Sequence, residues 1–596
     1  MINKYDYREL RELINANHDR FSELNFDNSL STLQKMNALV ELLKVLLKEF
    51  NSIVEYLEQF QEKFDEKLYT TVEEILQKWK DDGVFDDIVN DIILDGVTHR
   101  LYYFNTVAEM KAYQKLKLGD SVKTTGFNSQ GDGGGALYKI IAKTDDFEID
   151  EGGYISLANG LVANIIVENG TIDIAQFGAS RSMGNNAGPI AQKVIDYIEK
   201  HKVLSNYDMT LFLSGKHRFA SGITISGGRI SVRGNGFGSI MNCDANIPYA
   251  IRYNVPEGTS TTGTLRDFMI INPAVCVTST RAAVDLSISG VWFGQSGKHI
   301  DGSFVSVDIS NCFLEMAKQG SINTQTATGF RKFVISNNIF YGNNGFHINM
   351  VGDPNYTRIT NGIISGNSFD QAIEPLVAGN GGVRLAFARD IAITGNNING
   401  EGGLYNTNMF SLISCKHITF SANIAHHSNA GILSMSSCEH IFLDIMAHDT
   451  VGGVVISDSK FINGKIMVQG VDGVGIYLNR VTDSQLSLIA HNCVQTGIQI
   501  YNSTDNIFNQ ITAIGNNTRN DFLFGGLVVS DETNPTSRNI FKDCIIYGNL
   551  RQNLLVNKGT TNTVFKDISF KTDSLELFVD LAQDESNIFQ NVRTFG

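Results

Sequence analysis

The sequence has little proline, few charged residues and no long apolar run. Only 7 of its 596 residues are proline, and 19% are charged, against an average of about 25%. Proline has no N–H to donate, so its scarcity favours long uninterrupted β ladders. No stretch reaches the roughly 18 uninterrupted apolar residues of a membrane-spanning helix. The chain starts with polar, amphipathic sequence, so we expect neither a membrane span nor a cleavable signal peptide.

Basic residues are also scarce. The net charge is −15, from 48 Lys and Arg against 63 Asp and Glu. Phosphate contacts with nucleic acids need clustered Lys and Arg, so no nucleic-acid partner is expected. The same charge disfavours an anionic polymer as substrate unless the groove that holds it is locally basic.

The cysteines show no pairing pattern. They form an odd, scattered set without Cys-x-x-Cys spacing, so buried free thiols are expected rather than disulfides or zinc ligands. No metal site and no cofactor is predicted. The seven cysteines are Cys243, Cys276, Cys312, Cys415, Cys438, Cys493 and Cys544.

What the chain has instead is glycine and a repeat. Gly431, Gly453, Gly475 and Gly497 lie 22 residues apart, and each opens the same short strand pattern. A second apolar segment recurs in the same register, at 424–426, 445–448, 466–469 and 488–491. A repeat this short holds two or three strands and cannot bury a core alone. Neighbouring repeats must therefore stack into a solenoid.

The first hundred residues have a helical pattern. Residues 1–28 are predicted to be an attachment arm, and residues 29–96 a coiled-coil stem, because apolar residues recur in steps of three and four. Leu and aromatic residues at both seam positions favour more than two strands, so we predict a homotrimer. The alternative is an amphipathic helix that packs on its own domain. The seam comprises Met36, Leu39, Leu43, Leu46, Phe50, Ile53, Leu57, Phe60 and Phe64.

Residues 97–170 are predicted to form a small β domain of short strands and turns. It contains a glycine-rich segment, from Gly131 to Gly135. A glycine-rich loop can hold phosphate, but neither a Lys-Ser/Thr pair nor a helix start follows this one. A tight structural turn is therefore the better interpretation.

Three segments resemble the front end of phage tail spikes and appendage proteins. They are Gly-Asp-Gly-Gly-Gly at 131–135, Phe-Gly-Ala at 177–179, and a predicted amphipathic helix over about 187–200 with Ile190, Val194 and Ile198 on one side. Segments 211–215 and 230–236 are also similar. The order of parts is most similar to that of pre-neck appendage or tail-spike proteins of small phages of Gram-positive hosts.

This resemblance implies a mainly β fold. Residues 171–590 would form a pectate-lyase-like right-handed parallel β-helix, the helix at 187–200 would cover its open end, and residues 591–596 would form a C-terminal end. It also implies a protein of the virion tail or neck, made in the host cytoplasm and attached to neck, collar or tail proteins through its N-terminus. Recognition of a host-surface glycopolymer, often with cleavage, would be its function.

A row of polar and aromatic residues is expected along the solenoid. Asn-containing turns separate the strands, and these asparagines are predicted to stack in hydrogen-bonded ladders. Aligning the repeats on these turns puts one residue of each rung on a common line, with rungs about 4.8 Å apart. Such a row does not fit a core and should face outward, either as a polymer-binding wall or as a plain solvated face. A register shift by one would place Gly470 and Asn492 on it. We call this row the outer line: Glu315, Tyr341, Asp370, Asn399, His426, His448, Gln469 and His491.

Two carboxylates on the outer line fit glycoside hydrolysis. Glu315 and Asp370 stand two rungs apart, or about 9–10 Å, which is near the separation of the acid and base in an inverting glycosidase. Tyr341 lies between them and could stack on a sugar ring. Glu374 and Arg384 follow closely in the sequence, and an arginine suits bidentate contact with phosphate or uronate.

The lower part of the line fits acid–base chemistry on a phosphodiester. His426, His448 and Asp449 are the candidate catalytic residues, and His427 is a candidate binding residue. Metal binding is a weaker interpretation, because no metal-ligand spacing such as His-Glu-x-x-His is present. Asn399, Gln469 and His491 complete the candidate substrate-binding residues.

Four functions are compatible with these residues. Because the resemblance points to Gram-positive hosts, the preferred hypothesis is cleavage of wall teichoic acid, with His426 or His448 as acid–base and Arg384 holding phosphate. The second is a glycoside hydrolase or lyase that uses Glu315 and Asp370 on capsular polysaccharide or exopolysaccharide. The third is a receptor-binding protein without catalysis, and the fourth is a purely structural role.

Overall fold

The computed structural model divides into two compact units, Met1–Arg100 and Leu101–Gly596. It describes residues 101–595 except for 145–147, 202–207, 325–330, 355–358, 371–380, 400–407, 520–524, 531–532 and 572–575, together with isolated residues between 37 and 81. The described residues of the first unit are helical, and Lys44 and Glu41 form an ion pair of 2.7 Å one turn apart. The predicted arm and the predicted seam lie outside the described residues.

The second unit begins with a five-stranded sheet in the region predicted as a small β domain. Its strand order is β1-β2-β3-β5-β4, and only β1 and β2 pair in parallel. The sheet belongs to the same compact unit as the rest of 101–596, so the domain boundary at 170 stays a prediction. The elements are β1 (Leu101–Phe104), α4 (Val107–Ala112), β2 (Ser121–Thr124), β3 (Leu137–Ile141), β4 (Tyr154–Ser156) and β5 (Val162–Ile165).

The glycine-rich segment is a structural turn built around Asp132. The backbone N–H groups of Phe127, Asn128, Ser129 and Gly134 donate to its carboxylate at 2.8–3.0 Å. Burial alone would raise the pKa of Asp132, but these four donors lower it below its ordinary value. The carboxylate therefore closes the loop from inside, as an anion would at a phosphate site.

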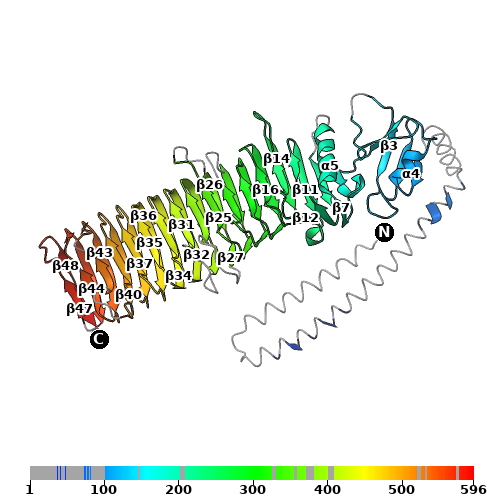
Figure 1. Cartoon of the computed structure of the whole chain (residues 1–596). Helices are drawn as coiled ribbons and strands as arrows, with labels where there is room; N and C mark the ends of the chain where they lie inside the picture. The colour runs from blue at the N-terminus through cyan, green and yellow to red at the C-terminus, as the bar shows by residue number, and fades with distance from the viewer. Residues whose placement is uncertain are drawn as a thin grey trace. The chain divides into compact units, whose positions relative to one another are not determined.

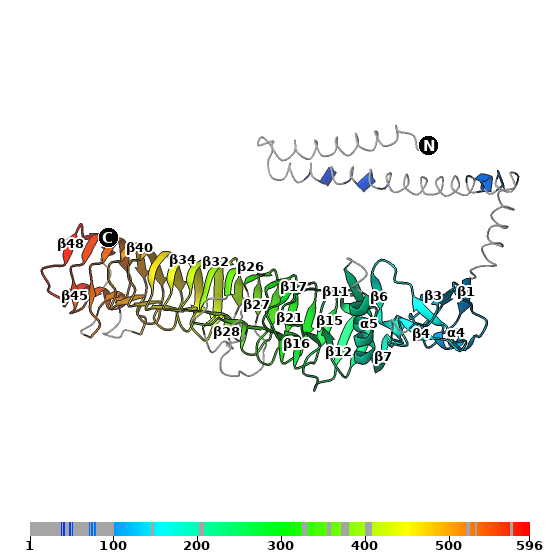
Figure 2. The same ribbon diagram turned by 90° about the horizontal axis from the view of Figure 1, so that it is seen from above.

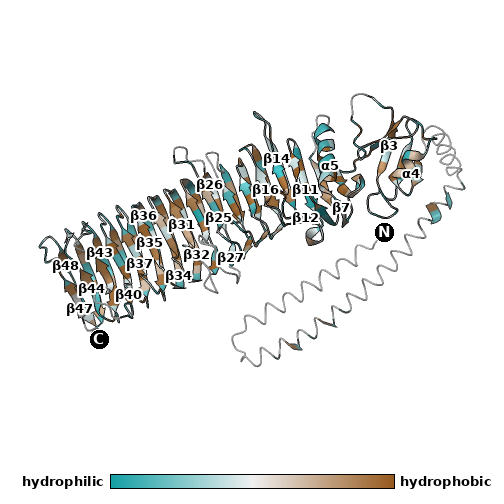
Figure 3. Cartoon of the chain, in the orientation of Figure 1, coloured by the Kyte–Doolittle hydropathy of each residue, from teal (hydrophilic) through white to brown (hydrophobic). Residues whose placement is uncertain are grey.

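The remaining strands stack in parallel as a β-solenoid of the right-handed type (Figures 1 and 2). One face is a 15-stranded sheet that runs from β10 (Ile223–Ile225) to β47 (Glu576–Asp580), and the other strands belong to a 27-stranded sheet, apart from the short pair β42 (Thr536–Ser537) and β45 (Thr560–Thr561). Buried and partly exposed residues alternate along the strands, for example in β33 (Leu433–Ser436) and β35 (Val454–Ser457). The same alternation appears as brown and teal in Figure 3. The buried residues of successive strands fill a continuous apolar core, which no single rung could bury.

The two ends of the solenoid are formed differently. At the start, α5 (Gly188–His201) contacts β8 (Met209–Leu213) and β10, with Val194 and Ile198 fully buried. At the other end, β49 (Arg593–Phe595) pairs with β46 (Val564–Lys571). The segment predicted as a separate C-terminal end thus contributes a strand to the last rung.

The predicted asparagine ladder is confirmed, and it lies inside the wall. The side-chain oxygen of Asn367 accepts hydrogen bonds from the backbone N–H and the side-chain amide of Asn338, both at 3.0 Å. Asn396 does the same for Asn367, and Asn423 for Asn396. All four are at most 1% exposed. Each amide satisfies the turn of the neighbouring rung, so the ladder fixes the register of the stack.

The seven cysteines are buried free thiols, as the sequence predicts. Among the residues that the structure describes, no helix has the length and apolarity to span a bilayer.

Candidate functional site

The outer line exists in the register that the sequence predicts. Each member pairs directly with the next on the neighbouring strand, from Glu315↔Tyr341 to Gln469↔His491. All are partly exposed, and Gln469 is exposed. The strands are β21 (Phe313–Glu315), β24 (Ile339–Tyr341), β27 (Ser368–Asp370), β30 (Asn397–Asn399), β32 (Lys416–Ser428), β34 (Glu439–Thr450), β36 (Lys460–Gln469) and β38 (Gln485–His491).

A column of left-handed residues explains why the line stays straight. Where the structure describes it, the residue after an outer-line member has left-handed backbone and bends the chain away from the sheet. This conformation is tolerated best by Gly, Asn, Asp and His. The alternative register is therefore wrong, because Gly470 and Asn492 occupy the bend rather than the line. The described residues of this column have φ of 53–65°: Met316, Gly342, His427, Asp449, Gly470 and Asn492.

The structure brings the predicted histidines together on two adjacent rungs. The rings of His426 and His448 stack with their centroids 5.3 Å apart and their planes 7° apart. His427 packs edge-on against both rings, and its Nδ1 lies 2.9 Å from Nδ1 of His426. His448 Nδ1 lies 2.9 Å from a carboxylate oxygen of Asp449. We call these four residues the histidine cluster.

The contacts of the histidine cluster set which ring nitrogens are available. The Asp449 carboxylate can only accept, so Nδ1 of His448 carries the proton and donates to it. Nε2 of His448 is left as the proton-transfer atom, an arrangement that suits acid–base chemistry. Nε2 of His426 lies 3.2 Å from the side-chain oxygen of Asn397. His427 and Asp449 are about half exposed, so a polymer could reach the cluster from solvent.

The described residues contain no group of three or more His, Cys, Asp or Glu side chains arranged to hold a metal ion. The stacked imidazoles face one another rather than converging on one point.

The two candidate carboxylates lie on the outer line with Tyr341 between them. The indole Nε1 of Trp292 donates to Oε2 of Glu315 at 3.0 Å, and Ser368 Oγ donates to Oδ2 of Asp370 at 3.1 Å. Both carboxylates are therefore held by a neighbouring donor. Their separation of two rungs is the one expected from the sequence.

Arg384 does not lie with the histidines. It belongs to β28 (Gly381–Ala386) in the 15-stranded sheet, whereas the outer line lies in the 27-stranded sheet. Its guanidinium lies 5.8 Å from the ring centre of Phe346, on the neighbouring strand of the same sheet. The structure thus separates Arg384 from His426 and His448, because β28 belongs to the 15-stranded sheet whereas β32 and β34 belong to the 27-stranded sheet. Glu374 falls in the part of the chain that is not described.

No repeat in the sequence predicts the aromatic row beside Glu315. Trp292 on β18 (Trp292–Gly294) packs edge-on against Phe313 and Phe237, with ring centroids 5.2 and 5.3 Å apart. Phe313 in turn lies 6.5 Å from Tyr341 in a nearly parallel orientation. These aromatic residues lie at unequal spacings in the sequence, because the rungs that carry them differ in length. A fixed repeat period therefore cannot place them in one row.

No family model matches the chain. The pre-neck appendage protein of Bacillus phage B103 is 29% identical over 178 residues, which are 30% of this chain and 16% of that protein. The expected resemblance to phage appendage proteins is confirmed. The chain thus matches less than a fifth of the length of this relative.

Several solved structures share the stacked β architecture at low similarity. The full-length tailspike protein 2 of Escherichia coli O157:H7 bacteriophage CAB120 has 13% identity and a TM-score of 0.38, over 72% of this chain and 54% of that chain. The gp42 tailspike of Acinetobacter phage vb_AbaP_AS12 has 11% identity and a TM-score of 0.39, over 83% and 74%. The tailspike gp49 of Acinetobacter baumannii bacteriophage Fri1, described as a capsular polysaccharide depolymerase, has 12% identity and a TM-score of 0.31, over 83% and 75%.

Proposed function

We propose that this chain is a phage virion appendage that binds a host-surface glycopolymer and cleaves wall teichoic acid by phosphodiester hydrolysis. The observation that supports cleavage is the histidine cluster, in which Asp449 orients His448 beside the stacked ring of His426. The match with a pre-neck appendage protein supports the virion location. The appendage would be a homotrimer, attached through its N-terminal unit to neck, collar or tail proteins.

The proposed reaction needs two proton transfers. Neutral His448 takes a proton from water at Nε2 while the water oxygen attacks phosphorus, and Asp449 stabilises the imidazolium that forms. Protonated His426 gives its proton to the leaving polyol oxygen as the P–O bond breaks. The products are a phosphomonoester and a free hydroxyl. With Arg384 on the other sheet, phosphate would be held by the imidazolium of His426 and by His427.

The test is incubation of the purified protein with wall teichoic acid, followed by measurement of soluble phosphate and polymer length. Shortened, phosphate-bearing fragments are expected from the parent, and none from His426→Ala or His448→Ala. His440→Ala is the matched control, because His440 lies on the same strand as His448 but at its other end. Equal degradation by the parent and both cluster variants would remove the histidines from the mechanism.

A second candidate, glycoside hydrolysis, is favoured by the position of Glu315 and Asp370 two rungs apart with Tyr341 between them. It predicts new reducing ends from a capsular polysaccharide or exopolysaccharide, lost in Glu315→Gln and Asp370→Asn. A lyase would instead release an unsaturated product. Saturable adsorption to cell walls with no shortening of any polymer would leave a receptor-binding protein without catalysis.

A further inference from the structure

A patch of four aromatic rings covers the outer face of the solenoid well before the histidine cluster. Phe237, Trp292, Phe313 and Tyr341 form a continuous chain of ring contacts, each 5.2–6.5 Å between centroids. Phe237 is 58% exposed although it is a large apolar residue. Exposed aromatic rings in a row are costly in water unless they serve a binding surface.

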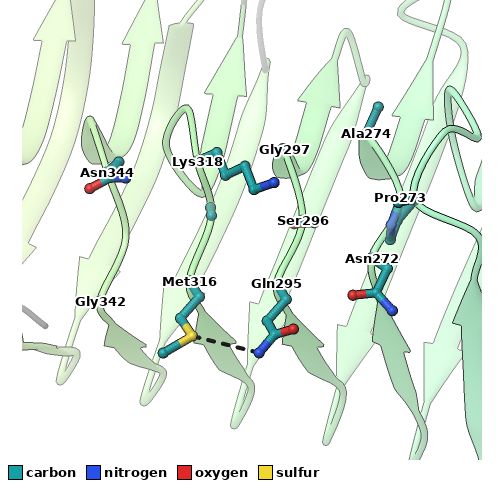
Figure 4. A pocket seen from close by; sticks show the side chains of 12 residues that line it. Asn272, Pro273, Ala274, Gln295, Ser296, Gly297, Met316, Lys318, Gly342 and Asn344 are labelled. Carbon is teal, nitrogen blue, oxygen red and sulfur yellow. Dashed lines mark hydrogen bonds between the residues drawn. The ribbon is translucent and has the colours of Figure 1, made fainter. Parts of the chain in front are cut away.

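A groove runs along the turns beside this patch. It has a volume of about 450 Å³ and is lined by residues of five successive turns. Small residues such as Ala274, Gly297 and Ala317 form its floor, and Lys318 extends across the neighbouring turn toward Gly297 (Figure 4). The groove lies next to the patch along the chain, because Gly342, which lines the groove, directly follows Tyr341.

The polar groups of the groove are amides and one cation. Asn272, Gln295 and Asn344 present side-chain amides, which can donate to and accept from hydroxyl groups. The ammonium of Lys318 has no carboxylate within 4.0 Å among the described residues, in contrast to Lys298, which pairs with Asp301 at 2.8 Å. The site thus offers an apolar face, amides and an uncompensated positive charge within a few rungs.

We propose that the aromatic patch and the groove form a glycan-binding site, separate from the histidine cluster, for a pyranose chain that carries an anionic substituent. The rings would stack on the apolar faces of successive sugars, the amides would bind hydroxyl groups, and Lys318 would bind the anion. The Oε1 atom of Glu315 would accept from a further hydroxyl, while its Oε2 is held by Trp292.

The length and position of the site fit a polymer that is held without being cut there. Phe237 lies just before β12 (Ile240–Cys243), and Tyr341 lies on β24. Four rung steps separate these two strands, or about 19 Å along the axis. Three further rungs separate Tyr341 from His426, or about 14 Å. One long polymer could therefore occupy both sites, which would raise its effective concentration at the histidine cluster.

Tryptophan fluorescence provides a direct test, because the sequence contains only Trp79 and Trp292. In a Trp79→Phe background, Trp292 is the single reporter. The probes are hyaluronan, polygalacturonate and sugar-substituted wall teichoic acid, and the first two are matched by their carboxyl-reduced, neutral forms. At least one anionic probe is expected to change the emission saturably, and its neutral form to bind at least tenfold more weakly.

Two exposed-residue variants make the test specific. Phe237→Ala is expected to weaken binding of both forms of the probe at least fivefold, and Lys318→Ala to abolish the preference for the anionic form. Phe442→Ala and Lys465→Ala, which replace exposed residues elsewhere on the wall, are the matched controls and should bind as the parent does. His448→Ala should also keep the full fluorescence change, even if the proposed cleavage is wrong.

The proposal is overturned if none of the probes changes the emission saturably. It is also overturned if Phe237→Ala and Lys318→Ala both bind like the control variants.

Discussion

Histidines occur on both sides of the solenoid wall, and the two groups differ in burial and in the groups they contact. His217, His299 and His347 are completely buried, and burial lowers the pKa of all three, to about 3 for His299 and His347. Of the outer-line histidines, His426 and His448 are partly accessible to solvent and contact a carboxylate or one another, whereas Nε2 of His491 is buried and burial lowers the pKa of its ring. Position relative to the wall, rather than residue type, decides whether an imidazole is a structural group or a reactive one.

The inner histidines act as neutral hydrogen-bonding groups. His299 Nε2 donates to the carbonyl oxygen of Glu315 at 3.1 Å, so it supports the backbone of an outer-line residue from the inside. The side-chain amide of Asn343 lies 3.1 Å from Nδ1 of His347. Neither contact compensates a buried positive charge, which is why the neutral form is favoured.

Replacement of an inner histidine should have the largest effect. We expect His347→Ala to lower the free energy of unfolding by about 3 kcal/mol, because the ring packs against Phe340 and Phe369 and its removal leaves a cavity and an unpaired amide. Urea unfolding followed by circular dichroism measures this loss. A loss below about 1 kcal/mol would mean that burial is not what distinguishes the inner group.

Replacement of an outer histidine should affect activity instead. If the proposed hydrolysis is right, His448→Ala lowers kcat/KM for wall teichoic acid by about 100-fold, or about 2.7 kcal/mol in the barrier. The urea midpoint should stay within error of the parent, since the side chain is partly exposed. Destabilisation equal to that of His347→Ala would contradict the comparison.

Acid should act mainly on the inner group, although partial burial also lowers the pKa of His491 on the outer line. An unfolded histidine binds a proton below about pH 6.5, but His299 and His347 stay neutral in the folded chain down to about pH 3. Stability is therefore intact above pH 6.5 and is lost as pH falls, by about 2 kcal/mol per histidine at pH 5. Unfolding free energies at pH 7.5 and 5 test this, and His347→Ala should lose less on acidification than the parent.

The smallest effect is expected at His440, an outer histidine away from the cluster. Its ring stacks on Phe461 at 4.7 Å on the solvent side of the wall. His440→Ala should change the free energy of unfolding by no more than about 0.5 kcal/mol and leave its dependence on pH unchanged. A larger change in thermal or urea unfolding would show that stacking on the outer face contributes to the fold.

The outer line could be predicted from the sequence because each rung of a solenoid repeats the same local geometry. From His426 to His491 the rungs are nearly equal in length, and the recurrent apolar segments that end at His426, His448, Gln469 and His491 align these four residues. Counting from the recurrent glycines instead gives the register that is one residue off, with Gly470 and Asn492. The asparagine turns carried the same alignment upstream to Glu315. A buried amide that must pair with its neighbour in the next rung is a strong constraint on sequence.

The parts of the candidate site that the sequence did not predict depend on turns, whose length and path vary from rung to rung. Arg384 follows a long connection after Asp370, and its sheet could not be inferred from spacing. The contacts of Phe237 with Trp292 and of Trp292 with Phe313 join residues from three rungs of unequal length. Such contacts depend on side-chain direction across the wall, which a one-dimensional repeat does not specify.

The even stacking of the rungs gives the outer face a regular spacing along the solenoid axis. Its divisions are about 4.8 Å apart, whereas a bound polymer is divided by the length of its own repeating unit. When these two spacings are unequal, groups of the polymer and residues of the wall come into register only at regular intervals. If the proposed polymer binding is right, such a wall would distinguish polymers by the length of their repeating unit, and a shift by one polymer repeat would restore the same set of contacts.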